Sequence, residues 1–166
     1  IREVLSHTTS LLVVCNTKKQ AQFLFQQLRQ TDAVCFHLSA SMCQAHRKTV
    51  LNQMRAALEE SRKGGPRVLC ISTQVIEAGV DVSFGSDIRF AAGMDNVVQT
   101  AGRCNRNGES SVPVPVYLLN CSDENLGRLQ EIQNAKTATL QLASAFCKNP
   151  EQFDSDLASD LSISCY

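Results

Sequence analysis

Short apolar runs alternate along this chain with longer segments in which apolar residues recur every three or four positions. The apolar runs lie at 11–16, 33–39, 67–73, 87–93 and 114–120. Runs that are continuously apolar, such as LLVVCN and RVLCIST, are typical of strands buried on both faces of a parallel sheet. The sequence therefore predicts an α/β fold with a mainly parallel central sheet and helices on both faces.

Helical periodicity marks three of the segments between and after these runs. They are 18–30, the segment after Ser41, and 124–147, and a further helix is expected between the last two apolar runs. Ser41 and Gln44 have the spacing of a capping box, which would start the second of these helices.

The composition limits the kinds of partner and the location. The chain has 166 residues, enough for one domain with a buried core. Lys+Arg and Asp+Glu are both 16, so any anion-binding site must be built locally rather than from a global basic field. No apolar run is long enough to span a membrane and no signal peptide is visible, so we expect a cytoplasmic protein without a membrane partner.

We expect one domain over 1–147, followed by a tail at 148–166 that either begins a truncated accessory segment or is disordered, the latter above all in its last residues. Because Ile1 is not a natural start, the chain is expected to be a piece of a longer protein. The eight cysteines include no CxxC pair, so we expect no metal site and reduced, mostly buried thiols.

Small polar residues end or directly follow the first three apolar runs. They are Asn16, Thr17, Ser39, Thr73 and Gln74. Because the carboxyl ends of parallel strands meet at one edge of a sheet, these residues are expected to form one polar rim. Each of them alone equally suits a helix cap or a turn.

The octapeptide QTAGRCNR places Gln99, Arg103 and Arg106 at positions i, i+4 and i+7, which share one face if the segment is helical. Clustered arginines favour an anion, although a solvated surface is the simpler alternative. The sequence contains no GxxxxGK[ST] phosphate loop. A nucleoside triphosphate would therefore be held mainly by another domain, with these arginines reaching across an interface.

Four stretches carry a family resemblance. STQVIEAGVDV (72–82) and VVQTAGRCNRNGE (97–109) closely resemble motifs V and VI of superfamily 2 helicases. LVVCNTKKQAQ (12–22) and HLSASMCQAHR (37–47) resemble the motif IV region and the segment after it. Over roughly 5–147 the chain is similar to the CRISPR-associated helicase–nucleases of type I systems. Many superfamily 2 helicases have an arginine where this chain has Thr100, which argues against a DEAD-box or DEAH-type RNA helicase.

The resemblance implies the second RecA-like domain of an ATP-dependent helicase. ATP would be shared with an absent first RecA-like domain, which would also hold magnesium. The site residues that it implies are the catalytic Arg106, Arg103 and Gln99, of which Arg106 is the arginine finger, and the nucleotide-contacting Gly79, Asp81 and Gly102. Asp81 would accept a hydrogen bond from a ribose hydroxyl, and Gly102 would allow close approach of the other domain.

The resemblance also implies contact with single-stranded DNA. Asn16, Thr17, Ser39, Thr73 and Gln74 would hold phosphates, and Glu77 would couple the two sites. The implied partners are the first RecA-like domain and a nuclease domain of the same parent chain, and a CRISPR surveillance complex. The fragment alone is expected to be inactive as an ATP hydrolase.

Two alternatives remain open from the residues. One is the second motor domain of another superfamily 2 DNA translocase, which would share motifs V and VI. The other is a non-catalytic nucleic-acid or protein binding module on a RecA-like scaffold. The sequence preceding Ile1 would distinguish them, by the presence or absence of a phosphate loop and of a nuclease domain.

Overall fold

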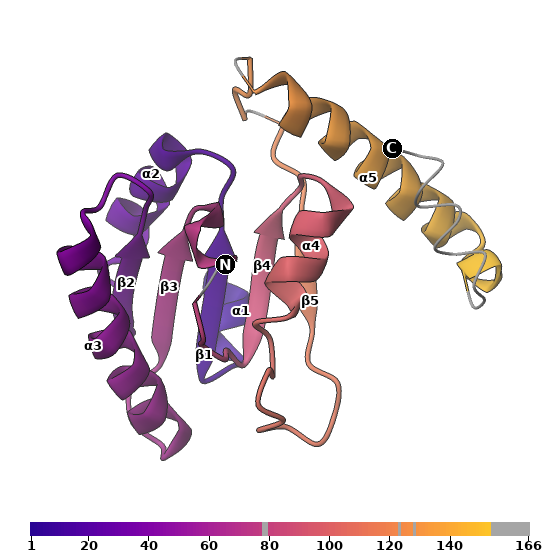
Figure 1. Ribbon diagram of the computed structural model, residues 1–166. Coiled ribbons are helices and arrows are strands. Elements are labelled where there is room, and N and C mark those ends of the chain that lie inside the picture. The colour runs from indigo at the N-terminus through magenta and orange to yellow at the C-terminus, as the bar shows by residue number, and fades with distance from the viewer. Residues whose placement is uncertain (78–79, 123, 128, 154–166) are drawn as a thin grey trace.

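The protein is built around one five-stranded sheet, seen in a computed structural model that describes residues 1–77, 80–122, 124–127 and 129–153 (Figure 1). The strand order is β2-β3-β1-β4-β5, and every neighbouring pair is parallel. The strands are β1 (Ser10–Val14), β2 (Val34–Leu38), β3 (Val68–Ser72), β4 (Ser86–Phe90) and β5 (Val116–Leu119). The predicted parallel sheet is confirmed, and each strand lies within one of the predicted apolar runs or differs from it by one residue.

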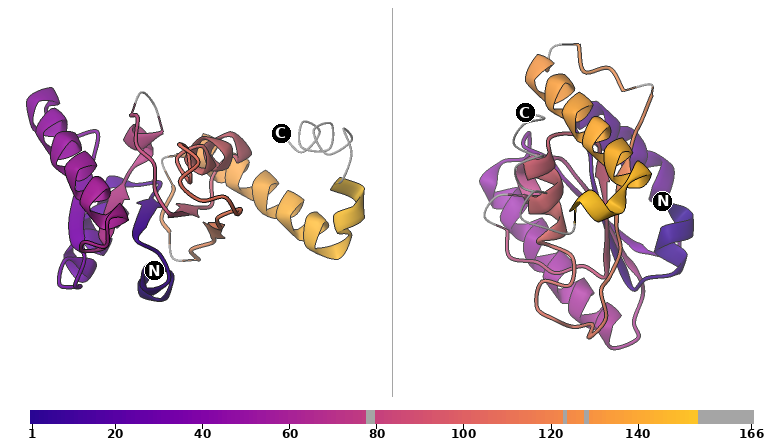
Figure 2. Two further views of the ribbon diagram at one scale, coloured as in Figure 1. Left: turned by 90° about the horizontal axis from the view of Figure 1, so that it is seen from below. Right: turned by 90° about the vertical axis from the view of Figure 1, so that its right-hand side faces the viewer.

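Helices cover both faces of the sheet, as predicted (Figure 2). Leu12 and Val14 of β1 point to the face that carries α3 (Gln44–Arg62), where Met54 and Leu58 are buried. Leu11 and Val13 point to the opposite face, which carries α1 (Arg2–Ser6) and α2 (Lys18–Leu28). This alternation explains the continuously apolar sequence of β1, since each residue enters one of two cores.

Two helix starts differ from the prediction. The N-cap of α3 is Cys43, so the predicted capping box of Ser41 and Gln44 is wrong; the Ser41 backbone N–H donates to Ser39 Oγ at 3.3 Å instead. The last long helix, α5 (Gln130–Lys148), begins six residues later than expected, because the chain before it forms a connecting loop. Periodicity does not detect where a helix gives way to such a loop.

The remaining elements are short. They are α4 (Met94–Ala101) and the 3₁₀ turns η1 (Gln74–Ile76) and η2 (Pro150–Phe153). Most of the predicted tail, from residue 154 onward, lies outside the described residues. None of the helices within the described ranges is both long enough and apolar enough to cross a membrane.

The cysteines that the structure describes are all free thiols. Cys15 and Cys70 are buried, whereas Cys43 and Cys147 are exposed. The expectation of mostly buried thiols is therefore wrong for this part of the chain. Thiols inside central strands are covered by helices, and those in helix caps and last turns are not.

Candidate functional site

Three of the predicted strand-end residues lie at one edge of the sheet. Asn16, Ser39 and Thr73 follow β1, β2 and β3, which are adjacent, and all three are buried. The Asn16 amide donates to Ala91 O at 2.8 Å and to Glu124 Oε2 at 3.2 Å. Its side chain is thus committed to bonds inside the domain, which favours a structural role over direct contact with phosphate.

Thr17 and Ser39 keep some capacity for a ligand. Thr17 is the N-cap of α2 and its Oγ1 accepts from the Gln20 backbone N–H at 3.2 Å. Ser39 Oγ accepts from Ser41 N. A hydroxyl that accepts one bond can still donate its own proton. Gln74 is half-buried, and its amide points to Asn16 O at 3.5 Å.

The segment after β3 crosses the face of the sheet from the carboxyl end of β3 to the amino end of β4. Val80, Val82 and Phe84 are buried in the core beneath α3. The alternating Asp81 side chain points outward and is 78% exposed. Asp81 therefore lies over the α3–α4 face rather than at the strand-end rim, and its position is set by the apolar residues on either side. Gly79 lies outside the described residues.

Gln99, Arg103 and Arg106 do not share one face of a helix, so that prediction is wrong. α4 ends at Ala101, and Gly102 is its C-cap. Beyond it the chain forms a short parallel bridge with Phe84: Phe84 N donates to Arg103 O at 2.9 Å and Asn105 N donates to Phe84 O at 2.8 Å. Asn105 has φ 48°, in the left-handed region, which no helix interior accommodates.

The two arginines consequently lie in different environments. Arg103 is 8% exposed, and its Nη2 donates to Glu77 O at 2.8 Å. Its Nε has no hydrogen-bond partner within the described ranges. Arg106 is 42% exposed and pairs with Asp81, with 3.1 Å between Nε and Oδ1. Gln99, on the last turn of α4, is exposed.

Gly102 is not required by contacts inside the described domain. A Cβ added there would lie 3.5 Å from Gln99 O and 3.6 Å from Val98 O, which is ordinary van der Waals contact. Its predicted role, close approach of another domain, stays a prediction.

Arg89, which was not among the predicted site residues, lies in the middle of β4 and is fully buried. Its Nε lies 2.8 Å from Glu77 Oε1, and its Nη1 donates to Asn16 Oδ1 at 2.6 Å and to Phe90 O at 2.7 Å. The Nε contact is a close ion pair without the linear geometry of a hydrogen bond. An arginine inside the apolar run DIRFAAG was the available signal, because a charge there needs a partner.

Glu77 is the centre of this buried network. Its Oε1 accepts from Thr100 Oγ1 at 3.2 Å and its Oε2 accepts from Asn96 Nδ2 at 3.1 Å. Burial raises the pKa of the Glu77 carboxyl, while the Arg89 charge and the hydrogen bonds from Thr100 and Asn96 oppose that rise. Through Glu77 the end of β3 contacts β4, α4 and Arg103, a position suited to the predicted coupling role.

Asp87 is a second buried titratable residue that the sequence pattern did not single out. It lies on β4, is fully buried, and neither carboxyl oxygen has a hydrogen-bond partner in the described residues. Burial raises its pKa to about 8. The carboxyl is therefore mostly protonated in the folded domain at neutral pH.

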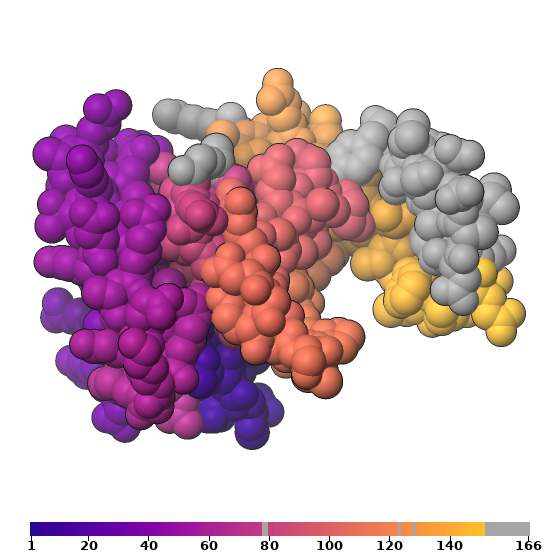
Figure 3. All heavy atoms as spheres, turned by 60° about the horizontal axis from the view of Figure 1, so that its bottom comes forward, coloured from indigo at the N-terminus to yellow at the C-terminus, as the bar shows by residue number. Residues whose placement is uncertain are grey.

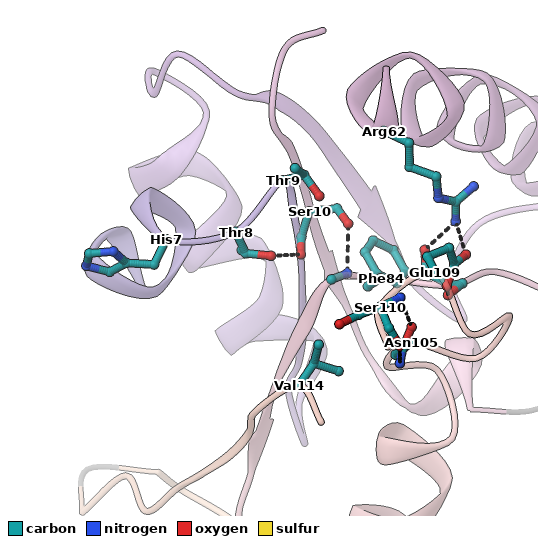
Figure 4. A pocket seen from close by; sticks show the side chains of 12 residues that line it. His7, Thr8, Thr9, Ser10, Arg62, Phe84, Asn105, Glu109, Ser110 and Val114 are labelled. Carbon is teal, nitrogen blue, oxygen red and sulfur yellow. Dashed lines mark hydrogen bonds and ion pairs between the residues drawn. The ribbon is translucent and has the colours of Figure 1, made fainter. Parts of the chain in front are cut away.

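A cavity of about 400 Å³ lies at the opposite, amino edge of the sheet (Figure 4). In Figure 3 the loop after Arg106, in orange, stands beside the indigo N-terminal segment on this side of the molecule. The polar groups around the cavity bond to one another. Arg62 pairs with Glu109 at 2.8 Å, and Asn105 exchanges two bonds of 2.8 Å with the main chain of Ser110. Neither Arg103, Arg106 nor Asp81 lines the cavity.

Known proteins resemble the chain in sequence. The sequence model described as CRISPR-associated nuclease/helicase Cas3, C-terminal, matches residues 7–109. The Cas3 protein of Haloferax volcanii is 49% identical over 57 residues, which are 32% of this chain and 6% of that protein. The ATP-dependent RNA helicase eIF4A of Candida albicans is 28% identical over 128 residues, which are 75% of this chain and 29% of the relative. The chain thus spans less than a third of the relatives that it matches.

Solved structures share the fold. T. fusca Cas3 with AMPPNP matches with a TM-score of 0.71 at 16% identity, over 95% of this chain and 20% of that one. A chain of a CRISPR RNA-guided surveillance complex in a pre-nicking state matches with a TM-score of 0.69 at 19% identity, over 97% of this chain and 22% of that one. The α/β fold described above is therefore RecA-like. Since the sequence model covers more than half of the residues, the chain belongs to the family of Cas3 C-terminal helicase domains.

Proposed function

We propose that this chain is the second motor domain of an ATP-dependent helicase that moves along single-stranded DNA in CRISPR antiviral defence. It supplies Arg106, Arg103, Gln99, Asp81, Gly79 and Gly102 to an ATP site whose phosphate loop and magnesium ligands belong to a first RecA-like domain. The parent protein would act in the cytoplasm, with its nuclease domain, as a partner of a CRISPR surveillance complex. The family and the match to a chain of such a complex support this proposal.

The observation that carries the proposal is the unequal pairing of the two arginines. The buried Arg103 guanidinium has an Nε without a partner in the described residues, and a buried donor of this kind favours an anionic acceptor. Arg106, three residues further along the chain, is exposed, and among the described residues it pairs with one surface carboxylate, that of Asp81. Triphosphate oxygens fit both groups, because a guanidinium is always charged and presents its N–H donors in a fixed fork.

The pair between Asp81 and Arg106 fits the two roles proposed for these residues. A surface ion pair contributes only about 0–1 kcal/mol, so a nucleotide can replace it at little cost. On binding, Asp81 would turn to a ribose hydroxyl and Arg106 to the transferring phosphoryl group. An arginine that meets charge developing in the transition state accelerates phosphoryl transfer by about 10³–10⁵.

The DNA strand would follow the carboxyl ends of β1, β2 and β3. Thr17, Ser39 and Thr73 are the groups with hydroxyl protons to offer, and Gln74 adds an amide. Asn16 would act indirectly, by fixing the end of β1, since its amide is already bonded. Contacts of this kind hold the backbone without reading bases, which suits a translocating motor.

Arg106→Ala in the full-length parent protein tests the proposal. The turnover rate for ATP should fall by about 10³ or more, while ATP binding weakens far less. Arg106→Lys should recover little, because an ammonium does not reproduce the planar fork. The thermal midpoint should hardly change, since the side chain is on the surface.

Steady-state kinetics and thermal melting decide the outcome together. An alanine variant that melts much lower, while its folded fraction hydrolyses ATP at the normal rate, would make Arg106 a structural residue. A wild-type parent protein without nucleic-acid-dependent ATPase activity would favour the binding-module alternative instead.

A further inference from the structure

We infer that Arg89 is a positioning residue for ATP hydrolysis: by neutralising Glu77 inside the domain, it keeps the Arg103 guanidinium free for the nucleotide. This inference rests on the proposed function, in which Arg103 contacts the triphosphate. Arg89 lies on β4, outside the four stretches that resemble helicase motifs.

Arg103 is already held at residue 77, by the carbonyl rather than by the carboxylate. Its Nη2 donates to Glu77 O at 2.8 Å, so the buried Glu77 carboxylate is only the length of one side chain away. Arg103 Nε remains without a partner in the described part of the chain. A buried anion and a buried cation with a spare donor attract strongly in this low-dielectric setting.

Arg89 removes that attraction by occupying the carboxylate first. Its Nε lies 2.8 Å from Glu77 Oε1, and both side chains are almost completely buried, at 0% and 3% exposure. Bonds to Asn16 Oδ1 and Phe90 O, at 2.6 and 2.7 Å, fix the guanidinium in this position. Asn96 and Thr100 donate hydrogen bonds to the same carboxylate, and both donor groups are neutral.

Without Arg89, Glu77 would be a buried carboxylate whose nearest available cation is Arg103. The expected result is that Arg103 turns from the nucleotide to Glu77. Losing one charge-assisted hydrogen bond to the γ-phosphate lowers affinity for a triphosphate about 10- to 100-fold and leaves affinity for a diphosphate nearly unchanged.

The experiment compares four variants of the full-length parent protein. Arg89→Met exposes Glu77 to Arg103, and Arg89→Lys keeps a neutralising charge. The double variant Arg89→Met with Glu77→Gln removes the pair altogether. Arg62→Met is the control: it breaks another ion pair, Arg62 with Glu109 at 2.8 Å, which lies at the amino edge of the sheet and contacts neither Arg89 nor Glu77.

The readout is the ratio of the dissociation constants for ADP and for a non-hydrolysable ATP analogue, measured by calorimetry below the melting temperature of each variant. The ratio should fall about tenfold or more in Arg89→Met, stay near the wild-type value in Arg89→Lys, and recover in the double variant. Arg62→Met should leave the ratio at the wild-type value, whatever it does to the melting temperature, because its ion pair lies at the opposite edge of the sheet.

Failure of the inference and failure of the proposed function give different results. If wild-type protein does not distinguish ADP from the ATP analogue, the proposed role of Arg103 is wrong. If wild-type protein distinguishes them and folded Arg89→Met does so equally, Arg89 is only structural. Should Arg89→Met fail to fold, the double variant decides, since a folded double variant that has lost the preference for the triphosphate overturns the inference.

Discussion

The buried Asp87 carboxyl makes the stability of this domain depend on pH in an unusual direction. Asp87 is fully buried and has no hydrogen-bond partner for either oxygen in the described residues, and burial raises its pKa to about 8. In the unfolded chain an aspartate titrates near pH ~3.9. Folding therefore takes up a proton at every pH between these two values.

The sign and size of the effect follow from that proton. Because the pKa is higher in the folded state, the protonated carboxyl contributes to the free energy of unfolding. This contribution is present in full below pH ~3.9 and is lost as the pH rises toward 8. The loss is about 1.4 kcal/mol per pH unit, and hence about 4 kcal/mol between pH 4 and pH 7. That is a large part of the ~5–15 kcal/mol by which a domain of this size is stable.

Asp87→Asn keeps the shape of the side chain and removes the ionisation. The buried amide still lacks partners, which costs about 1–3 kcal/mol at every pH. The informative quantity is therefore the slope: the free energy of unfolding of the variant, relative to wild type, should rise by about 1.4 kcal/mol per pH unit from pH 5 to 7. The rise should level off above pH 8.

Urea unfolding of the 166-residue chain at pH 5, 6, 7 and 8 measures this difference. Asp32→Asn, in the exposed turn after α2, is the control and should run parallel to wild type at every pH. Parallel curves for Asp87→Asn as well would refute the reasoning, since they would mean that Asp87 is ionised in the folded chain.

Three further predictions concern the proposed function and the fold. The 166-residue chain alone should not hydrolyse ATP, with or without single-stranded DNA, because its sequence has no phosphate loop; turnover that tracks its concentration after contaminants are removed would contradict this. In the full-length protein, Thr17→Ala and Thr73→Ala should weaken single-strand binding about equally for unrelated sequences, whereas Thr17→Ser, which keeps the N-cap, should not; fluorescence anisotropy with two unrelated oligonucleotides separates backbone contact from base readout. Gly85→Ala should destabilise the domain by about 1–3 kcal/mol, because the added Cβ would lie 2.6 Å from Thr8 Oγ1. Adding Thr8→Ala should recover much of that loss in thermal melting, and a failure to recover would place the strain elsewhere.

The sequence by itself determined the fold class and the order of its elements. Continuous apolar runs such as LLVVCN, separated by amphipathic segments, place residues in two cores at once, and only a sheet covered on both faces satisfies that pattern. The common edge of Asn16, Ser39 and Thr73 followed from the same parallel order. Motif spacing was also local information, and it identified the family before any tertiary contact was known.

Only the tertiary structure decided how the polar residues are used. The end of α4 depends on the bridge with Phe84, which lies far back along the chain, so the spacing within QTAGRCNR did not reveal that Arg103 is buried and Arg106 exposed. Arg89 and Asn16 are 73 residues apart in sequence and 2.6 Å apart in the fold. A buried charge is stable only with partners, and those partners come from distant segments, whereas apolar periodicity is repeated within each segment.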